Sequence, residues 1–293
     1  MALIKIPHPN GDFKIESKLA LTLNAWIDAI FKYNQDLVVV FDGAEGAGKS
    51  TLMRQVGAYC QHYMKERHGH KVPFDINNIK FDLADYTENA IKLENEKGHI
   101  HDLDESRAVA NRKRSTSKGN VGFTNYLSEC RSAGHIHLIA LPAYHDLDSY
   151  VAIWRCSFLI HIEKYFAKTG EEKGVPIYEL KLGEYRVFLN DSKLKAMYYH
   201  KMKYIYPRKE VFRGRFDNIC IVDEAGYEDK KREARAARYS AESDDKNKGK
   251  ELTKAELAIR CKAAHPEWNK SEIARHLGCN RKTVHDALAS LKV

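Results

Sequence analysis

Hydrophobic and polar residues alternate along the first 160 positions in blocks that predict a layered α/β domain. Residues 37–41 form a continuous β-branched and aromatic run, which is typical of a strand buried on both faces of a parallel sheet. Apolar residues at helical spacing predict a helix before it, over residues 16–33. Further strands are predicted at 78–82, 99–103, 135–141 and 156–161, and helices at 49–65, 86–96 and 123–131. This alternation predicts a doubly wound, mainly parallel sheet.

The alternation ends after Glu163. Two short apolar runs, 178–182 and 185–189, flank Gly183 and predict an antiparallel hairpin. We therefore expect a β-rich extension over about residues 164–226.

The C-terminal part of the chain has a different composition. Residues 227–250 are strongly charged, and we interpret them as a charged helix and linker, with a solvated linker from Ser243 onward. A separate apolar pattern starts at Leu252. We expect one domain over residues 1–226 and a small all-helical domain over residues 251–293.

Bulk composition narrows the class of protein. The chain has 293 residues, of which 43% are hydrophobic, as in ordinary globular proteins. We expect a cytosolic protein, because we see neither a membrane segment nor the pattern of a signal peptide. Six cysteines without a C-x-x-C pair argue against a zinc ribbon and a disulfide framework. The net charge of +8 slightly favours nucleic acid as a partner.

A glycine-rich motif follows the first core strand. It reads Gly43-Ala44-Glu45-Gly46-Ala47-Gly48-Lys49-Ser50-Thr51 and matches G-x-x-x-x-G-K-[ST] at every fixed position. Glycines allow backbone N–H groups to converge on phosphate oxygens. Lys49 would place its ammonium on the β- and γ-phosphates, and the Ser50 hydroxyl would ligate Mg²⁺. The motif and its context predict a binding loop for ATP and Mg²⁺.

Two acidic segments compete as the second part of this site. Asp104 and Glu105 follow the predicted strand 99–103, where Asp104 would hold Mg²⁺ and Glu105 would act as the general base. The alternative is a surface acidic turn. Residues 219–224 have a cleaner apolar run before their acids, but they lie beyond the strand alternation. We interpret them as a terminal strand or the acidic first turn of a helix.

The loop paired with Asp104-Glu105 resembles the ASCE division of P-loop ATPases, over about Leu37 to Glu163. The chain is similar to the DNA-handling ATPases of phages, archaeal viruses and plasmids, which include FtsK–HerA-like and Zot-like enzymes. This similarity depends on Asp104-Glu105, on the basic segment 112–120, and on Arg131 just before a strand. It implies a homo-oligomer, often a ring, in the host cytosol if the chain is viral. A neighbour's arginine would complete the site, with Arg131 and Arg155 as the positions to test.

The chain departs from this family at the end of the fourth strand. The family commonly has a polar sensor there, whereas residues 141–145 read Leu-Pro-Ala-Tyr-His, so Tyr144 or His145 would have to substitute. The loop is also similar to that of thymidylate kinases. A nucleotide kinase is therefore an alternative, although we find no Asp-Arg pair where that family has it.

Residues 271–288 resemble the helix-turn-helix of many DNA-binding domains. Ser271 is expected to cap the first helix, Gly278 to supply the left-handed turn, and Asn280 to cap the second helix. A preceding helix at 252–264 would complete a three-helix unit. The outward residues of the second helix, expected to contact DNA, are Arg281, Lys282, Thr283 and His285. A module for protein contacts is the alternative.

Other basic and histidine-rich segments leave their roles open. Arg112 and Arg114 belong to a basic loop that would grip the DNA backbone in a ring or would simply be solvated. Residues 193–215 mix cations with aromatics on which bases could stack, but we favour the interpretation as a β-structured flap whose aromatics form its own core. Four histidines alternate along two predicted strands, and we expect them to be buried and hydrogen-bonded: His99, His101, His135 and His137.

The combined hypothesis is an ATP-hydrolysing, DNA-binding protein that translocates, packages or remodels the DNA of a mobile element. An ATP-gated transcriptional regulator is the alternative from a different class. The two differ in what DNA does: long DNA of any sequence should stimulate a motor, whereas a regulator should prefer one site and turn over slowly.

Overall fold

A computed structural model describes residues 2–104, 118–172, 175–199, 210–248 and 254–289. The chain divides into two compact units, residues 1–231 and 232–293. The boundary falls inside one helix, α6 (Glu224–Lys248). None of the helices in these ranges is both long and apolar enough to cross a membrane.

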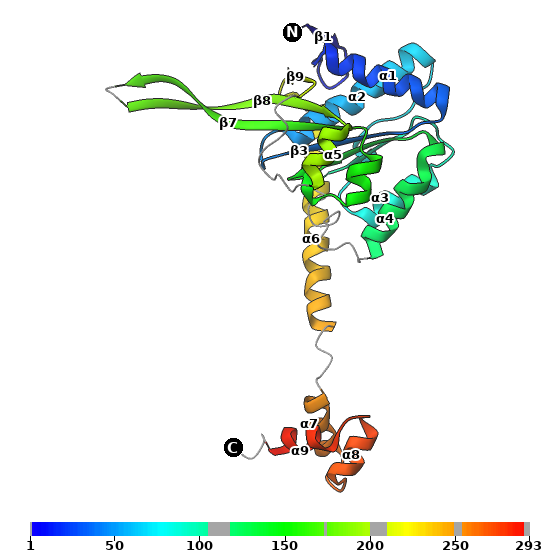
Figure 1. Ribbon diagram of the computed structural model, residues 1–293, viewed down its shortest axis with the longest axis vertical. Helices are drawn as coiled ribbons and strands as arrows, with labels where there is room; N and C mark the ends of the chain where they lie inside the picture. Colours follow the sequence, from blue (N-terminus) through cyan, green and yellow to red (C-terminus); the bar gives the residue numbers. More distant parts are fainter. Residues whose placement is uncertain (1, 105–117, 173–174, 200–209, 249–253, 290–293) are drawn as a thin grey trace. The chain divides into compact units, whose positions relative to one another are not determined.

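A seven-stranded sheet forms the centre of the first unit, with the strand order β4-β5-β6-β3-β7-β8-β9 (Figure 1). Its strands are β3 (Leu37–Gly43), β4 (Ile79–Lys80), β5 (Ile100–Leu103), β6 (Ile136–Ala140), β7 (Phe158–Glu172), β8 (Val175–Leu189) and β9 (Phe212–Arg215). The neighbours from β4 to β7 pair in parallel, whereas β8 and β9 are antiparallel. The mixed α/β class with a mostly parallel sheet is therefore confirmed.

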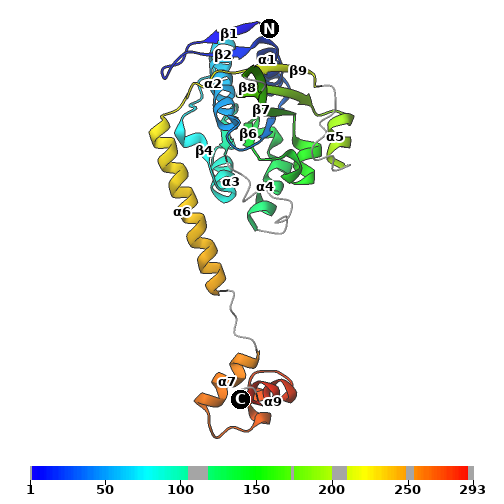
Figure 2. The ribbon, with the colours of Figure 1, turned by 90° about the vertical axis from the view of Figure 1, so that its left-hand side faces the viewer.

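Helices cover both faces of this sheet (Figures 1 and 2). One layer contains α1 (Ser17–Tyr33) and α2 (Lys49–His68), packed on Leu37, Val39 and Phe41 of β3. The other contains α3 (Leu83–Lys92), α4 (Lys118–Glu129) and the turn η6 (Val151–Arg155), packed on Val38 and Val40. The other described elements of this unit are β1 (Leu3–Ile6), β2 (Phe13–Glu16), η1 (Ile76–Asn78), η4 (Cys130–Ala133), η5 (Tyr144–Asp146) and α5 (Ser192–Tyr199). The unbroken apolar run of β3 exists because both faces of that strand are buried.

The predicted hairpin around Gly183 is wrong. Both apolar runs, 178–182 and 185–189, belong to the single strand β8, which pairs with β7 from Phe158–Leu189 to Glu172–Val175. Gly183 has a φ of +82° beside a register shift, so it serves an irregularity within the strand. A glycine at such a bulge and a glycine in a turn look the same in sequence.

The outer half of this hairpin forms a two-stranded arm. From Tyr165 outward, β7 pairs only with β8 in the described part of the chain, and the arm extends beyond the rest of the sheet in Figure 1. Several of its apolar side chains are exposed, including Phe166, Tyr178 and Val175. Apolar residues on an unsupported hairpin are unusual and indicate a surface that is covered in use.

The two ends of helix α6 each bear on an expectation. The rival acidic segment ends in the first turn of α6, because the backbone N–H of Gly226 donates to the carboxylate of Asp223 (3.1 Å). This is one of the two interpretations given for it. Helix α6 then continues to Lys248, so the linker expected from Ser243 is helical in its first part.

After the end of α6, the described part of the second unit contains three helices, α7 (Lys254–Ala264), α8 (Lys270–His276) and α9 (Arg281–Ala289). Its core is small and consists of Ala258, Ile273, Ala274, Val284 and Ala287, with partly buried neighbours around them.

The turns of this unit match the prediction in two of three positions. Gly278 is left-handed with a φ of +57°, and Asn280 caps α9 through the backbone N–H of Lys282 (2.9 Å). The cap of α8 is Asn269, which forms a reciprocal capping box with Glu272, and not Ser271. Helix α8 begins at Lys270, so Ser271 lies inside the helix and the residue that precedes the helix is Asn269.

Candidate nucleotide and metal site

The glycines of the loop between β3 and α2 are required by its backbone. Gly43, Gly46 and Gly48 have φ values of +140°, +71° and +99°, a region that other residues rarely adopt. A Cβ at Gly43 would collide with the carbonyl oxygen of Ile162, and one at Gly48 would lie 2.8 Å from the Phe216 ring. The loop can therefore keep this concave shape only with glycine at these positions.

The lysine of the motif folds over the concave side of the loop. Its Nζ atom donates to the carbonyl oxygens of Gly43 (2.8 Å) and Ala44 (2.9 Å). Helix α2 begins at Lys49, so the N–H groups of its first turn point toward the loop and favour an anion there. The outer residues Ala44, Glu45 and Gly46 are exposed, Ala47 is buried, and Thr51 is half-buried. The arrangement fits a phosphate chain.

The two predicted magnesium ligands lie side by side. The Ser50 hydroxyl donates to Oδ1 of Asp104 at 2.9 Å. Asp104 immediately follows β5 and is only 2% exposed. Because β6 lies between β3 and β5 and all three are parallel, their carboxyl ends bring the loop and the acid to one edge of the sheet. Hydroxyl and carboxylate oxygens are the donors that Mg²⁺ prefers. Glu105 lies outside the described residues, so its role as a base stays a prediction.

The second oxygen of Asp104 is held by two residues that the sequence did not indicate. Oδ2 accepts from the Tyr227 hydroxyl (2.7 Å) and from Nη2 of Arg54 (3.2 Å). The Arg54 guanidinium also lies over the Tyr227 ring, 3.5 Å from its centroid. Burial raises the pKa of Tyr227 far above its usual range, so its hydroxyl stays protonated and donates. Arg54 follows Ser50 by one helical turn, and this spacing could have signalled it.

Asp102 is a further buried acid on the same face of β5. It is fully buried, and neither of its oxygens has a hydrogen-bond partner in the described part of the chain. Burial raises its pKa well above the usual value, as does the nearby charge of Asp104, whereas Arg54 and Lys230 act in the opposite direction.

The end of β6 does not supply the expected sensor through Tyr144. The Tyr144 hydroxyl donates to the carbonyl oxygen of Ala152 (2.6 Å) inside the core, and its backbone N–H donates to Asp42 (3.0 Å). The hydroxyl therefore faces the core instead of the loop. His145 stacks on Tyr198. At this edge, Asp42 instead lies against His161, with 2.9 Å between Oδ1 and Nδ1.

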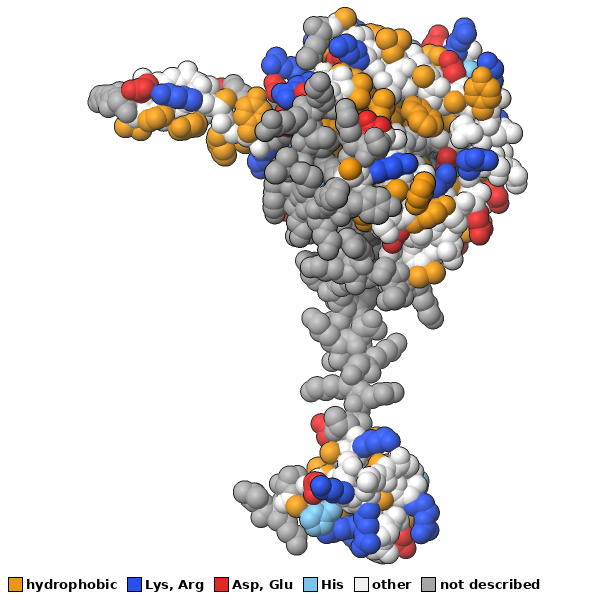
Figure 3. Space-filling view, in the orientation of Figure 1, with side chains coloured by type: hydrophobic (Ala, Val, Ile, Leu, Met, Phe, Trp, Pro, Cys, Tyr) orange, Lys and Arg blue, Asp and Glu red, His pale blue; other side chains and the backbone are white. Residues whose placement is uncertain are grey.

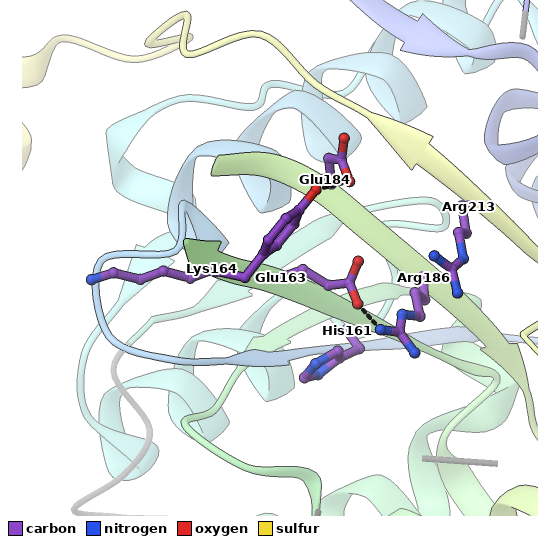
Figure 4. A pocket seen from close by; sticks show the side chains of 7 residues that line it. His161, Glu163, Lys164, Glu184, Arg186 and Arg213 are labelled. Atoms are coloured by element: carbon purple, nitrogen blue, oxygen red, sulfur yellow. Dashed lines mark hydrogen bonds and ion pairs between the residues drawn. The ribbon is translucent and has the colours of Figure 1, made fainter. Parts of the chain in front are cut away.

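A pocket of about 350 Å³ lies beside His161 (Figure 4). It is lined by His161, Glu163, Lys164, Tyr165, Glu184, Arg186 and Arg213. Glu163 forms an ion pair with Arg186, whereas Lys164 points away toward the loop and donates to the carbonyl oxygen of Glu45 (3.1 Å). Strand β7 therefore contacts the phosphate-binding loop directly.

The two arginines proposed to act on a neighbouring subunit lie at the opposite edge of the sheet. Arg131 precedes β6 and Arg155 precedes β7, whereas the loop follows the parallel strand β3. Arg155 is largely buried in an ion pair with Asp36, which favours a structural role, and its role in a neighbouring subunit stays a prediction. Arg131 is exposed, so its role stays a prediction.

The four histidines form one buried cluster, as expected. Each is at most 5% exposed, and His101 and His137 stack with their ring centroids 5.4 Å apart. Burial lowers the pKa of all four, that of His135 to about 4, so they are neutral at physiological pH. Ligand atoms of Asp36, Cys130 and His137 lie within 4.8 Å of one another. Burial raises the pKa of the Cys130 thiol to about 12 and Asp36 pairs with Arg155, which disfavours a metal there.

The residues proposed to contact DNA lie on α9 of the second unit. Arg281, Lys282 and His285 are exposed, and Thr283 is half-buried. Figure 3 shows Lys and Arg side chains on the face of this unit that is in view. Arg112 and Arg114 lie outside the described residues. The DNA-contacting roles of all these residues stay predictions.

No family model matches the chain, and no match was found among curated proteins. Among solved structures, it is similar to the genome packaging NTPase B204 from Sulfolobus turreted icosahedral virus 2, solved in complex with ATP-gammaS. The TM-score is 0.33 and the identity is 14%, over 54% of this chain and 93% of that chain. This likeness is too distant to carry an argument about the function of the chain.

Proposed function

We propose that the chain is a Mg²⁺-dependent ATPase that acts on DNA, as a packaging, translocating or remodelling enzyme of a phage, virus or other mobile element. The observation that carries the enzymatic part is the hydrogen bond between Ser50 and Asp104. It joins the hydroxyl of a complete phosphate-binding motif to a buried acid at the end of β5, a strand separated from β3 by β6 alone.

Each residue of the site has a role in this proposal. Backbone N–H groups of residues 43–49 bind the phosphates, and Lys49 turns its ammonium from the loop carbonyls to the β- and γ-phosphates. Ser50 and Asp104 hold Mg²⁺, which neutralises charge that develops on the phosphates. Glu105 takes the proton of the attacking water.

The DNA-binding part of the proposal depends on the second unit. A left-handed turn at Gly278 joins α8 to α9, and the outer face of α9 presents Arg281 and Lys282 to solvent. A short basic helix after such a turn suits the major groove. One small module binds weakly, so several copies in a homo-oligomer would raise the overall affinity. The exposed apolar arm of β7 and β8 is consistent with self-association.

The test is phosphate release from ATP by the purified protein, with and without long duplex DNA. We expect Mg²⁺-dependent hydrolysis that rises with DNA and falls by at least about 100-fold in Glu105→Gln. An Arg281→Ala, Lys282→Ala double variant should keep the basal rate and lose the stimulation. Hydrolysis that is indifferent to DNA and to Glu105→Gln would overturn the proposal.

An ATP-gated transcriptional regulator remains the second candidate. The contact between Tyr227 of α6 and Asp104 favours it, because α6 is the helix that runs toward the DNA-binding residues along the chain. A regulator would bind one DNA sequence at least about 1,000-fold more tightly than random DNA, whereas a motor would not.

A further inference from the structure

We propose that Tyr227, at the start of α6, is a positioning residue for the metal ligand Asp104, so that binding of Mg²⁺-nucleotide and the attachment of α6 to the site reinforce each other. This inference rests on the proposed function and adds a residue and a helix that the nucleotide-binding motifs do not include.

The first argument is that the two oxygens of Asp104 have different partners. Oδ1 faces Ser50, on the side where the metal would bind, and Oδ2 faces Tyr227 and Arg54. The Tyr227 hydroxyl also interacts with the Ser50 side chain, so it lies next to the place where the metal would bind. A metal held by Ser50 and Oδ1 is still compatible with the hydrogen bond from Tyr227 to Oδ2. Donors to the second oxygen of a ligating carboxylate fix its orientation, and their loss typically costs about 10–100-fold in metal affinity.

The second argument is that the contact is built and not incidental. Asp104 is 2% exposed and Arg54 and Tyr227 are each 4% exposed, so all three groups have given up water. Tyr227 is packed on both sides, by Arg54 over its ring and by Phe81 with centroids 5.7 Å apart. A buried carboxylate that loses one of its donors is left partly unsatisfied, which is costly.

The third argument is that α6 is fastened to the same region at a second point. One turn after Tyr227, the ammonium of Lys230 donates to the carbonyl oxygens of Ile76 (2.7 Å) and Ile79 (2.8 Å), at the edge strand β4. The first two turns of α6 are thus attached to the sheet by Asp104 and by β4. Any ligand that favours the observed orientation of Asp104 also favours this attachment, because such coupling is reciprocal.

The test measures nucleotide affinity on the full chain with a fluorescent ATP analogue, in Mg²⁺ and in EDTA. Tyr227→Phe keeps the ring and its packing on Arg54 and removes only the hydroxyl. We expect it to weaken binding about 10-fold in Mg²⁺ and to leave binding in EDTA unchanged. Tyr86→Phe is the matched control, because it removes a buried hydroxyl from the other face of the sheet, and both of its affinities should equal those of the wild type.

Amide hydrogen exchange of residues 224–231 supplies a second readout that does not depend on activity. We expect Mg²⁺-nucleotide to slow exchange there in the wild type and to have less effect in Tyr227→Phe. Equal affinities for wild type and Tyr227→Phe in Mg²⁺, or an equal loss in Mg²⁺ and EDTA, would overturn the inference alone. Failure of the wild type to bind the analogue at all, with Lys49→Ala as the reference for no binding, would overturn the proposed function as well.

Discussion

Strand β5 has buried polar side chains on both faces, and the surroundings of these side chains differ between the two faces. Toward α2, Asp104 accepts hydrogen bonds from three side chains on two helices, Ser50 and Arg54 of α2 and Tyr227 of α6. Toward α3 and α4, His101 lies among other imidazoles and tyrosines that burial keeps neutral. The acidic face is therefore suited to exchange a donor for a metal ion, whereas the histidine face is closed on itself and only stabilises the fold.

The largest effect is expected from acid, which should lower the free energy of unfolding through the histidine face. The pKa values of the four histidines lie below 6.5 in the folded state, so the unfolded chain binds more protons as the pH falls below that value. Their contribution is fully present above about pH 6.5 and is lost progressively toward pH 4. His135, with a pKa of about 4, then accounts for about 3 kcal/mol of the stability that is lost between neutral pH and pH 4.

Urea unfolding at pH 7.5, 6.0 and 5.0 measures this dependence. The groups that face the cluster are Glu96, Tyr86, Tyr126, Cys130, Asp36 and Arg155. We expect the midpoint to fall steadily below pH 6.5 and an exposed-histidine control, His285→Asn, to follow the wild type. A midpoint that stays constant down to pH 5 would contradict neutral, buried histidines.

On the acidic face, Asp104→Asn should remove the metal-dependent part of nucleotide binding. We expect at least about 100-fold weaker binding in Mg²⁺, because loss of a direct ligand exceeds the about 10–100-fold cost of outer partners. Binding in EDTA should change little. Calorimetric titration with an ATP analogue checks this, and unchanged affinity in Mg²⁺ would exclude Asp104 as a ligand.

Removal of one hydroxyl from the histidine face should affect stability alone. The Tyr86 oxygen lies 2.6 Å from Nδ1 of His137, and both groups are fully buried. Tyr86→Phe leaves that nitrogen without its partner, so we expect a loss of about 1–3 kcal/mol in the free energy of unfolding. Urea unfolding at pH 7.5 measures it. A loss of Mg²⁺-dependent affinity in this variant would mean that the two faces are not independent.

The smallest effect is expected where the histidine cluster meets solvent. Glu96 lies 3.4 Å from Nδ1 of His99 but is more than half exposed. Glu96→Gln should therefore change the free energy of unfolding by less than about 0.5 kcal/mol at pH 7.5. Thermal unfolding checks this, and a loss above 1 kcal/mol would show that this pair is shielded from solvent.

Local patterns of the sequence were enough to predict much of the first unit. The apolar run of β3, the motif at residues 43–51 and the acid at the end of β5 each follow rules that depend on near neighbours in the chain. The strand order then brings Ser50 and Asp104 together, which the α/β alternation anticipates.

Other features could not be predicted because they depend on contacts between distant segments. Tyr227 lies far along the chain from Asp104, inside a charged segment that looks like solvated helix. The hairpin was misplaced because Gly183 serves a bulge, whose presence depends on how β7 pairs with β8. The ion pair between Arg155 and Asp36 is a further contact between segments that lie far apart in the chain.

The pair formed by Gly43 and Ile162 has a mechanical consequence. It is the last register pair between β3 and β7, and Gly43 is also the first residue of the phosphate-binding loop. The backbone of Ile162 lies so close to Gly43 that no side chain fits between them. Three residues later, at Tyr165, β7 continues into the two-stranded arm. The arm and the phosphate-binding loop are thus connected through the backbone of β7. A force that displaces the arm would therefore act first on the residues that surround the phosphates.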